Sequence, residues 1–319
     1  MTDWPKLKTG VLLWNQNTDW SALRDAGVLV DELGFDSLWT WDHLYPIVGD
    51  PHGPMYEGYM TLAAWAALTK RVTLGLMVGA NTFRNPALVA KMVTTLDHIS
   101  DGRAYLGIGG AWFETEHTAF GIEFGSSPGE RLRWFDEAVE LIRGMLHDET
   151  TTARGTYYHA HDVRNVPPPV QKHLPILIGG SGERKTLHTV AKYADAWNTG
   201  GGIERVQQKD AVLRRWCEEV GRDESEIERT LQGGSPVIRD TVEEAEKAGQ
   251  SIAEHNGWDQ HRGPFGTPES IAESLVDQVA LGFHHVYFDV CVPYDRETLE
   301  RLIGEVKPLL ERAIAPPTA

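Results

Sequence analysis

TGVLLW (residues 9–14) is a short apolar run, WSALRDAGVLVDELG (20–34) is an amphipathic helical stretch, and FDSLWTW (35–41) is a second apolar run. The same alternation continues through four more segments, which are YMTLAAWAALTK (59–70), RVTLGLMVG (71–79), PALVAKMVTTLDHIS (86–100) and RAYLGIGG (103–110). Apolar strands joined by helices indicate a parallel sheet with both faces covered, because the crossover helices shield each face from water. A closed barrel and an open sheet are both compatible with this pattern.

The number of strands favours one of these two architectures. Counting along the whole chain gives eight strands, each followed by helical sequence, near Val11, Leu38, Leu74, Leu106, Ile176, Ala196, Gln232 and Tyr287. Eight βα units favour a closed barrel over an open sheet. We therefore predict an α/β fold, a (β/α)8 TIM barrel formed by a single domain over residues 1–319.

Three stretches exceed a minimal barrel and are candidate lids, since loops after the strands build the active site of a barrel. They are a loop at residues 111–127 after the fourth strand, a hairpin followed by three prolines at 148–174, and an irregular segment at 254–267. Ser127 and Glu130 have the spacing of a capping box at the start of a helix expected over about residues 128–146. A later helix is expected to begin near Glu183.

Composition and charge argue against several classes of protein. The formal net charge of −16 opposes contact with nucleic acid or anionic membranes, and no stretch approaches the roughly 20 apolar residues that cross a bilayer. The first ten residues lack the basic and apolar regions of an export signal. Cys217 and Cys291 lie far apart without metal-type spacing, so we expect a reduced, cytoplasmic setting.

Asp42 and His43 follow the apolar strand FDSLWTW directly, at its carboxyl end. Barrel enzymes place their catalytic groups at this end, and a histidine there can exchange protons near neutral pH. The alternative is structural: Asp42 caps the strand and His43 is a satisfied histidine. Position alone does not separate the two.

Small residues end the third and fourth strands. Ala80, Asn81 and Thr82 follow the third strand, where small side chains let a planar ligand approach the backbone, although an ordinary βα turn has the same composition. Gly109 lies in the glycine-rich LGIGGAW after the fourth strand. The dinucleotide motif GxGxxG is incomplete there because position 112 is Trp, so a Rossmann fingerprint is rejected.

The segment ILIGGSGERKTL predicts an anion site. An apolar strand runs into Gly179, Gly180, Ser181 and Gly182, and successive glycines free backbone N–H groups to bind an anion at the start of a helix. Arg184 is a further donor. The motif GxxxxGK[ST] is missing, which argues against nucleotide triphosphate hydrolysis.

Neither metal catalysis nor hydrolase chemistry is expected. His159 and His161 would share one face of a strand, and His284 and His285 are adjacent, but neither pair has a further ligand at metal-type spacing. The nucleophile motif GxSxG of α/β-hydrolases is also missing.

Four segments together resemble the luciferase-like monooxygenase family, and in particular its subgroup of coenzyme F420-dependent oxidoreductases. The segments are LGFDSLWTWDHL, the run from TFRNPALVAK to TLDHISDGRAYLGIGGAWFETEH, PILIGGSGERKTL, and KYADAWN. They span most of residues 7–200 in the family's order. The resemblance implies a barrel that moves a hydride between coenzyme F420, a deazaflavin, and a small organic substrate.

The resemblance also implies roles for individual residues. It makes His43 the active-site histidine, which transfers a proton or polarises the ring, with Asp42 orienting it. It places the family's bulge, often with a non-prolyl cis peptide behind the ring, at Met77 and Val78. Ribityl contacts fall near Ala80, Asn81 and Thr82, the phosphate loop falls at Gly179, Gly180 and Ser181, and the assembly is expected to be a homodimer.

The residues expected at the open end of the barrel indicate the class of substrate. This sequence departs from the family's sugar-phosphate dehydrogenases at Trp112, where some members carry an acidic residue, and at Ile47, where they carry an aromatic one. Aromatic residues at the mouth would suit a less polar substrate. They are Trp14, Trp41, Tyr45, Tyr56, Trp112 and Phe113. We expect Trp14, Tyr45, Trp112 and Glu116 to contact the substrate.

Two other functions stay open. The same fold could use FMN in a two-component monooxygenase, which would need a separate reductase as partner. From a different class, the chain could be a non-catalytic barrel that binds phosphate or another anion.

Overall fold

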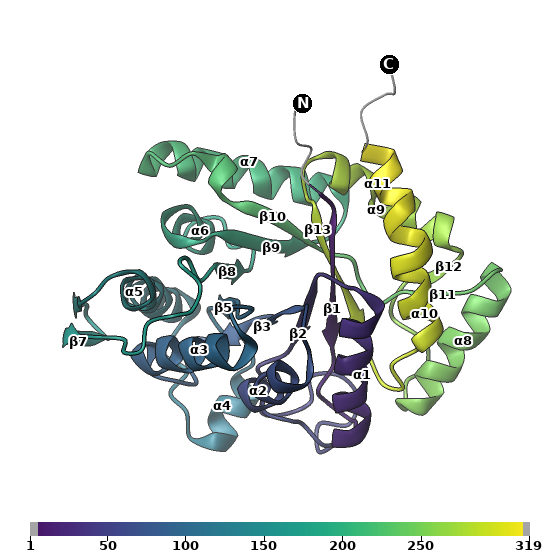
Figure 1. Ribbon diagram of the computed structural model, residues 1–319, viewed down its shortest axis with the longest axis horizontal. Coiled ribbons are helices and arrows are strands. Elements are labelled where there is room, and N and C mark those ends of the chain that lie inside the picture. The colour runs from purple at the N-terminus through teal and green to yellow at the C-terminus, as the bar shows by residue number, and fades with distance from the viewer. Residues whose placement is uncertain (1–5, 315–319) are drawn as a thin grey trace.

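The computed structural model describes residues 6–314, a ring of parallel strands enclosed by helices (Figure 1). Half of the ten-residue segment considered for an export signal therefore lies outside the described residues. The strands of the ring are β1 (Lys8–Leu13), β2 (Ser37–Thr40), β3 (Thr73–Leu76), β4 (Gly79–Ala80), β5 (Leu106–Gly109), β8 (Ile176–Gly179), β9 (Ala196–Gly200), β10 (Glu228–Gln232) and β13 (His285–Val290).

Helices follow the strands and pack outside the ring. They are α1 (Trp20–Leu33), α2 (Gly58–Leu68), α3 (Pro86–Ser100), α4 (Glu114–Phe120), α5 (Pro128–His147), α6 (Thr186–Tyr193), α7 (Ile203–Val220), α8 (Val242–His255), α9 (Pro268–Ala280), α10 (Arg296–Arg301) and α11 (Lys307–Ile314). A 3₁₀ turn, η1 (Glu224–Glu226), precedes β10, and a π-helical turn, η2 (Leu302–Val306), joins α10 to α11.

The strands follow one another around the ring in chain order, and every neighbouring pair is parallel. β3 and β4 are two halves of one strand that is interrupted at Met77–Val78, so that β3 pairs with β2 and β4 pairs with β5. A bridge between Leu74 and Ala104 closes the ring. The predicted eight-stranded barrel is therefore confirmed, with each of the eight predicted strand centres inside a strand of the ring.

Local capping explains most helix boundaries, with small differences from the sequence. Ser127 caps α5 as predicted, because its side chain accepts from the Glu130 amide. In a capping box, the carboxylate of Glu130 would accept from the backbone N–H of Ser127. It accepts instead from the backbone N–H of Ser126, one residue earlier. α6 begins at Thr186, three residues after the predicted start near Glu183.

The three insertions lie where the sequence placed them, but one has more structure than expected. The stretch 111–127 contains helix α4 and is not a loop throughout. The hairpin in 148–174 is confirmed as β6 (Thr151–Arg154) paired antiparallel with β7 (His159–Val163). The irregular segment at 254–267 ends in β12 (Phe265–Gly266), which pairs with β11 (Val237–Ile238).

Aromatic side chains fill the barrel below its open end. Trp39 is fully buried, and its ring packs against Tyr105 and Tyr287 with centroids 5.4 and 5.1 Å away. Gly75 pairs with Trp39 in the register of β2 and β3, and a Cβ at Gly75 would lie 2.4 Å from the Trp39 ring. Small residues beside large ones thus fill the interior of the barrel at this level.

No helix within residues 6–314 is both long enough and apolar enough to cross a membrane.

Candidate active site

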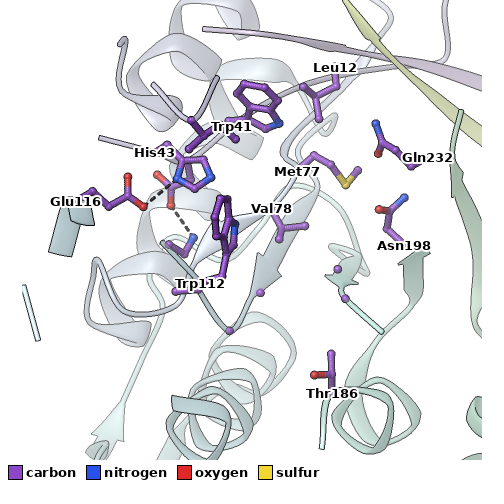
Figure 2. A pocket seen from close by; sticks show the side chains of 18 of the residues that line it. Leu12, Trp41, His43, Met77, Val78, Trp112, Glu116, Thr186, Asn198 and Gln232 are labelled. Atoms are coloured by element: carbon purple, nitrogen blue, oxygen red, sulfur yellow. Dashed lines mark hydrogen bonds and ion pairs between the residues drawn. The ribbon is translucent and has the colours of Figure 1, made fainter. Parts of the chain in front are cut away.

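A cavity of about 460 Å³ opens at the carboxyl ends of the strands (Figure 2). It takes residues from the ends of β1, β2, β4, β5, β8, β9, β10 and β13 and from the loop before α4. A volume of this size lies in the usual range for cofactor and small-molecule sites, ~300–1,000 Å³. This cavity is the candidate active site.

His43 lies in one wall of the cavity and is held by a partner from a distant segment. Its Nδ1 lies 2.9 Å from Oε1 of Glu116 on α4, and the other carboxylate oxygen accepts from the Leu44 amide at 2.7 Å (Figure 2). Because a carboxylate only accepts hydrogen bonds, Nδ1 carries the hydrogen and Nε2 is left for a ligand. Glu116 therefore orients the imidazole.

Asp42 has a different partner from the one expected. Its carboxylate accepts from both terminal nitrogens of Arg84, at 2.8 and 2.9 Å, and from the Ala80 amide at 2.8 Å. The expectation that Asp42 orients the His43 ring is corrected by these contacts, because its oxygens point to Arg84 and Glu116 takes the orienting position. Asp42 nevertheless lines the cavity beside His43.

The side chains of Asp42 and Arg84 form a buried ion pair. Burial raises the pKa of Asp42 above its ordinary value, against the opposing hydrogen bonds and positive charge of Arg84. The side chain of Asp42 is 1% exposed, and the Arg84 guanidinium also contacts Glu57 and lies 4.9 Å from the centroid of the Tyr59 ring. Burial by itself would lower the pKa of Arg84, but the hydrogen bonds and negative charge of Asp42 raise it above the ordinary arginine value. The pair therefore ties the end of β2 to β4 and to the turn before α3.

Val78 forms the floor of the cavity between two glycines. The non-prolyl cis peptide that the resemblance implied lies at Met77–Val78, and both residues line the cavity. A Cβ at Gly109 would lie 2.7 Å from the Val78 side chain, and one at Gly179 would lie 2.8 Å from it. Both strands can therefore approach Val78 only because they carry glycine there.

The glycine turn after β8 lines the cavity in part. Gly179 and Gly180 are lining residues, and Gly180 has a φ of +125°, which favours glycine. Ser181 and Gly182 are not among the lining residues, and the Ser181 hydroxyl lies 3.0 Å from that of Thr199. Thr186, the first residue of α6, takes their expected place.

Two residues predicted at the end of the third strand lie behind the cavity wall. Ala80 lines the cavity, but Asn81 and Thr82 do not. Asn81 is buried and its backbone N–H donates to the carbonyl oxygen of Gly109 at 3.1 Å. Thr82 Oγ1 lies 2.6 Å from His117 Nε2.

The predicted substrate residues separate into two groups. Trp112 and Glu116 line the cavity, and Trp112 is 64% exposed with its ring 5.6 Å from that of His43. Trp14 and Tyr45 are not lining residues. Trp14 is buried against Trp41, with ring centroids 4.6 Å apart, and Tyr45 packs on Phe120 at 5.5 Å.

Sequence reasoning missed a polar wall formed by the last strands. Asn198, Gln232 and Asp289 come from β9, β10 and β13, and all three line the cavity. Each is a polar residue near the carboxyl end of its strand, which is the signal that could have identified them. The other lining residues not selected as site residues from the sequence are Leu12, Trp41, Ile47, Gly110, Ala111, Leu132 and Thr186.

Within residues 6–314, no group of three or more His, Cys, Asp or Glu side chains is arranged to hold a metal ion.

The comparisons with known proteins identify the family. A family model described as luciferase-like monooxygenase matches residues 7–264. The chain belongs to the luciferase-like monooxygenase family. Its membership agrees with the observed architecture, since the chain aligns over 98% of its length, at a TM-score of 0.79 and 18% identity, with the whole of a solved F420-dependent secondary alcohol dehydrogenase bound to an F420–acetone adduct.

Two bacterial relatives of this chain are named as F420-dependent glucose-6-phosphate dehydrogenases. The relative from Kineococcus radiotolerans is 35% identical over 215 residues, which cover 66% of this chain but only 62% of the relative's length. The relative from Microbacterium testaceum is 29% identical over 323 aligned positions, which cover 92% of this chain and 94% of the relative.

Removing the positive partner of Asp42 should destabilise the fold strongly. We expect Arg84→Met to lower the free energy of unfolding by about 3–5 kcal/mol, because it leaves a carboxylate buried without its cation. The midpoint of urea unfolding measures this change.

The double variant Asp42→Asn with Arg84→Met is the matched control. It removes the buried charge as well, so it should recover part of the lost stability. A single variant as stable as the unmodified protein would contradict the ionised pair.

Proposed function

We propose that this protein is an oxidoreductase that transfers a hydride between coenzyme F420 and an organic substrate. The observation that carries the proposal is that His43 and the glycine turn at Gly179 and Gly180 line one cavity. Two relatives named as F420-dependent dehydrogenases support the choice of cofactor. When bound, the deazaflavin supplies a carbon atom that accepts or gives the hydride.

The shape of the cavity fits a flat ring with a phosphate tail. Gly109 and Gly179 leave the surface of Val78 uncovered by side chains, so a planar group can lie on it. The turn at Gly180 leads to the first residue of α6, Thr186, and backbone N–H groups at the start of a helix bind phosphate. The ring would therefore lie on Val78 with its tail directed toward Thr186.

A second cavity beyond this turn favours F420 over FMN. It has a volume of about 220 Å³, shares Leu132 with the main cavity, and is lined by Arg133 and Lys185. No carboxylate among the described residues forms a salt bridge with Arg133 or Lys185. Of the two acids in the same lining, Asp136 pairs with Lys192 at 2.8 Å, and Glu137 accepts hydrogen bonds from the backbone N–H groups of residues 156–158. F420 carries carboxylates beyond its phosphate, whereas FMN ends there, so unpaired cations at this position suit F420.

His43 is the residue that we propose to hold or move the proton. Hydride transfer to or from an alcohol or carbonyl requires a proton to leave or reach the oxygen atom. The Nε2 atom of His43 is available for it, since Nδ1 is bonded to Glu116. Trp112 beside the imidazole would limit the access of water to this atom.

The lining of the cavity favours an uncharged substrate. The lining residues include no lysine or arginine, and His43 is the one basic side chain among them. A substrate phosphate placed near His43, away from the start of α6, would lose its hydration without a cation in return. We therefore propose a less polar substrate than the glucose 6-phosphate named for the relatives, held by Trp41, Ile47 and Trp112.

We further propose that the protein is a homodimer that uses the face formed by α2 and α3. These helices pack side by side (Figure 1), and Met60, Leu68, Leu88 and Ile99 on them are exposed. α2 is apolar almost all round, which is typical of a helix covered on every side.

A cytoplasmic location and the lack of a reductase partner complete the proposal. Cys217 and Cys291 are both free and buried, which supports a reducing compartment. An F420-dependent dehydrogenase needs no separate flavin reductase, unlike the FMN-dependent alternative.

Titration with the two cofactors tests the reaction class. We expect F420 to bind at least about tenfold more tightly than FMN, because only F420 places carboxylates beside Arg133 and Lys185. Quenching of intrinsic tryptophan fluorescence measures both dissociation constants. Tighter binding of FMN would favour the monooxygenase alternative, and binding of phosphate with neither cofactor would favour a non-catalytic anion-binding barrel.

The double variant Arg133→Ala with Lys185→Ala distinguishes the contribution of the F420 tail to binding from that of the ring. Its affinity for F420 should fall by about tenfold or more at low salt, with little change for FMN. An equal loss for both cofactors would contradict the assignment of this second cavity to the F420 tail.

Replacing His43 should affect turnover more than binding. We expect His43→Ala to lower kcat by about a hundredfold or more, with F420 affinity changed by only a fewfold, because the residue acts on the transferred proton. Steady-state rates are followed by the loss of deazaflavin absorbance. His161→Ala, at a histidine side chain that is 83% exposed, is the control and should leave kcat unchanged. Unchanged kcat in His43→Ala would refute the role.

Substrate charge should decide the efficiency of the reaction. We expect kcat/KM for uncharged secondary alcohols to exceed that for glucose 6-phosphate by about tenfold or more, because the cavity offers no lysine or arginine to a phosphate group. The same absorbance assay measures both. A preference for glucose 6-phosphate would place an unrecognised phosphate site near the mouth.

A further inference from the structure

The wall of the cavity opposite His43 carries an acid that the proposed mechanism does not use. Figure 2 shows Asn198 and Gln232 on this side, across Met77 and Val78 from the imidazole. Asp289 on β13 lines the same cavity and is bonded to Gln232.

Asp289 has one hydrogen-bonded side-chain oxygen and one free oxygen. Gln232 Nε2 donates to Oδ1 at 2.6 Å, and no other side-chain contact of the Asp289 carboxyl occurs among the described residues. Asp289 is only partly buried, and its backbone N–H donates a hydrogen bond to the carbonyl oxygen of Gly234 at 2.8 Å. Since Asp289 lines the cavity, Oδ2 faces the space that a ligand would occupy.

No positive charge compensates Asp289. No Lys, Arg or His nitrogen of residues 6–314 forms a salt bridge with it, in contrast to Asp42 with Arg84. The neighbouring strands present Leu12 on β1, which is in register with it, and the neutral amide of Gln232 on β10. An isolated carboxylate in such surroundings is costly, and a carboxyl group there avoids the cost by keeping its proton.

The remaining titratable groups around Asp289 do not supply a compensating charge. They are Tyr287 on β13, Cys291 just after β13, and Asp42, His43 and Glu116 across the cavity. Burial raises the pKa of Tyr287 well above its ordinary value and that of Cys291 to about 12, so both side chains are neutral near pH 7. Asp42 and Glu116 are already bonded to Arg84 and His43.

We propose that Asp289 enters the cavity as a protonated acid and donates a hydrogen bond from Oδ2 to a carbonyl oxygen of the bound ligand. Gln232 fixes the position of the proton, because its N–H donates to Oδ1 and leaves Oδ2 to carry the hydrogen. The carbonyl oxygen belongs either to the cofactor ring or to the substrate. The identity of that ligand rests on the proposed F420 function, but the protonation of Asp289 does not.

Burial raises the pKa of Asp289 to about 7, against an opposing hydrogen bond from Gln232. A carboxyl group whose pKa is higher in the folded than in the unfolded protein holds its proton more tightly when folded. Its stabilising contribution is full below about pH 4 and is lost progressively as the pH rises toward 7. The unliganded protein therefore reports the protonation of Asp289 directly.

Thermal unfolding at a series of pH values tests the protonation without any ligand. Asp289→Asn is isosteric and always neutral, so its Tm should rise relative to that of the unmodified protein between pH 5 and about pH 7 and then level off. Gln232→Leu removes the hydrogen bond that lowers the pKa of Asp289, so its transition should move to higher pH. Glu149→Gln, at a side chain that is 85% exposed, is the control for loss of a surface charge. Parallel pH profiles for Asp289→Asn and the unmodified protein would overturn the proposal.

Binding measurements identify which ligand receives the hydrogen bond. The ratio of the F420 dissociation constants of the unmodified protein and Asp289→Asn cancels the titration of F420 itself. If the ring carbonyl is the acceptor, this ratio should rise by about tenfold per pH unit above pH 7, because one proton is linked to binding. If the substrate carbonyl is the acceptor, the ratio of KM values shows this rise instead. Ratios that stay constant for both would refute the donor role.

The two series also separate this proposal from the proposed function. Failure of the F420 proposal would appear as no F420 binding to either protein at any pH, whereas the stability profiles need no ligand. Loss of the pH-dependent difference in Tm between the unmodified protein and Asp289→Asn would count against Asp289 alone.

Discussion

The carboxylate of Asp42 is the contact on which the geometry of the site depends. It accepts two hydrogen bonds from Arg84 and one from the Ala80 amide, and so joins the end of β2 to β4. His43, the next residue, and Val78, two residues before Ala80, are thereby fixed relative to each other. A buried ion pair adds little net stability over an apolar pair, but it specifies one arrangement, because removing either partner leaves a polar group without compensation.

The floor of the cavity depends on the lack of side chains at two glycines of the neighbouring strands. Gly109 and Gly179 bring β5 and β8 so close to Val78 that a Cβ on either glycine would lie within 3 Å of its side chain. Below this level the barrel is filled by Trp39 and its aromatic neighbours, which need Gly75 beside them for the same reason. The cavity therefore lies directly above the layer of large aromatic side chains, at the level where the strands carry glycine.

The sequence could predict the barrel because its signals are local. Strand runs and caps such as Ser127 repeat within a few residues, and each of the eight predicted strands was found. The hydrogen-bond partners of the site residues could not be predicted in this way. Glu116 lies 73 residues from His43, and Arg84 lies 42 residues from Asp42, so no periodicity links them. Asp42 was assigned to His43 because it is adjacent in sequence, whereas adjacent residues at a strand end point in different directions.

The polar wall of the last strands was missed for a related reason. A polar residue such as Gln232 at the end of a strand is unremarkable by itself, and it acquires meaning only when closure of the barrel places it beside Asp289. Closure also separates two groups that can carry protons, since His43 and Gln232, the partner of Asp289, lie on opposite sides of Val78. A flat ring lying on Val78 would therefore meet a titratable group at each side, and an apolar surface beneath it. Under the proposed function, this separation would let one wall hold the ligand while the other exchanges a proton with it.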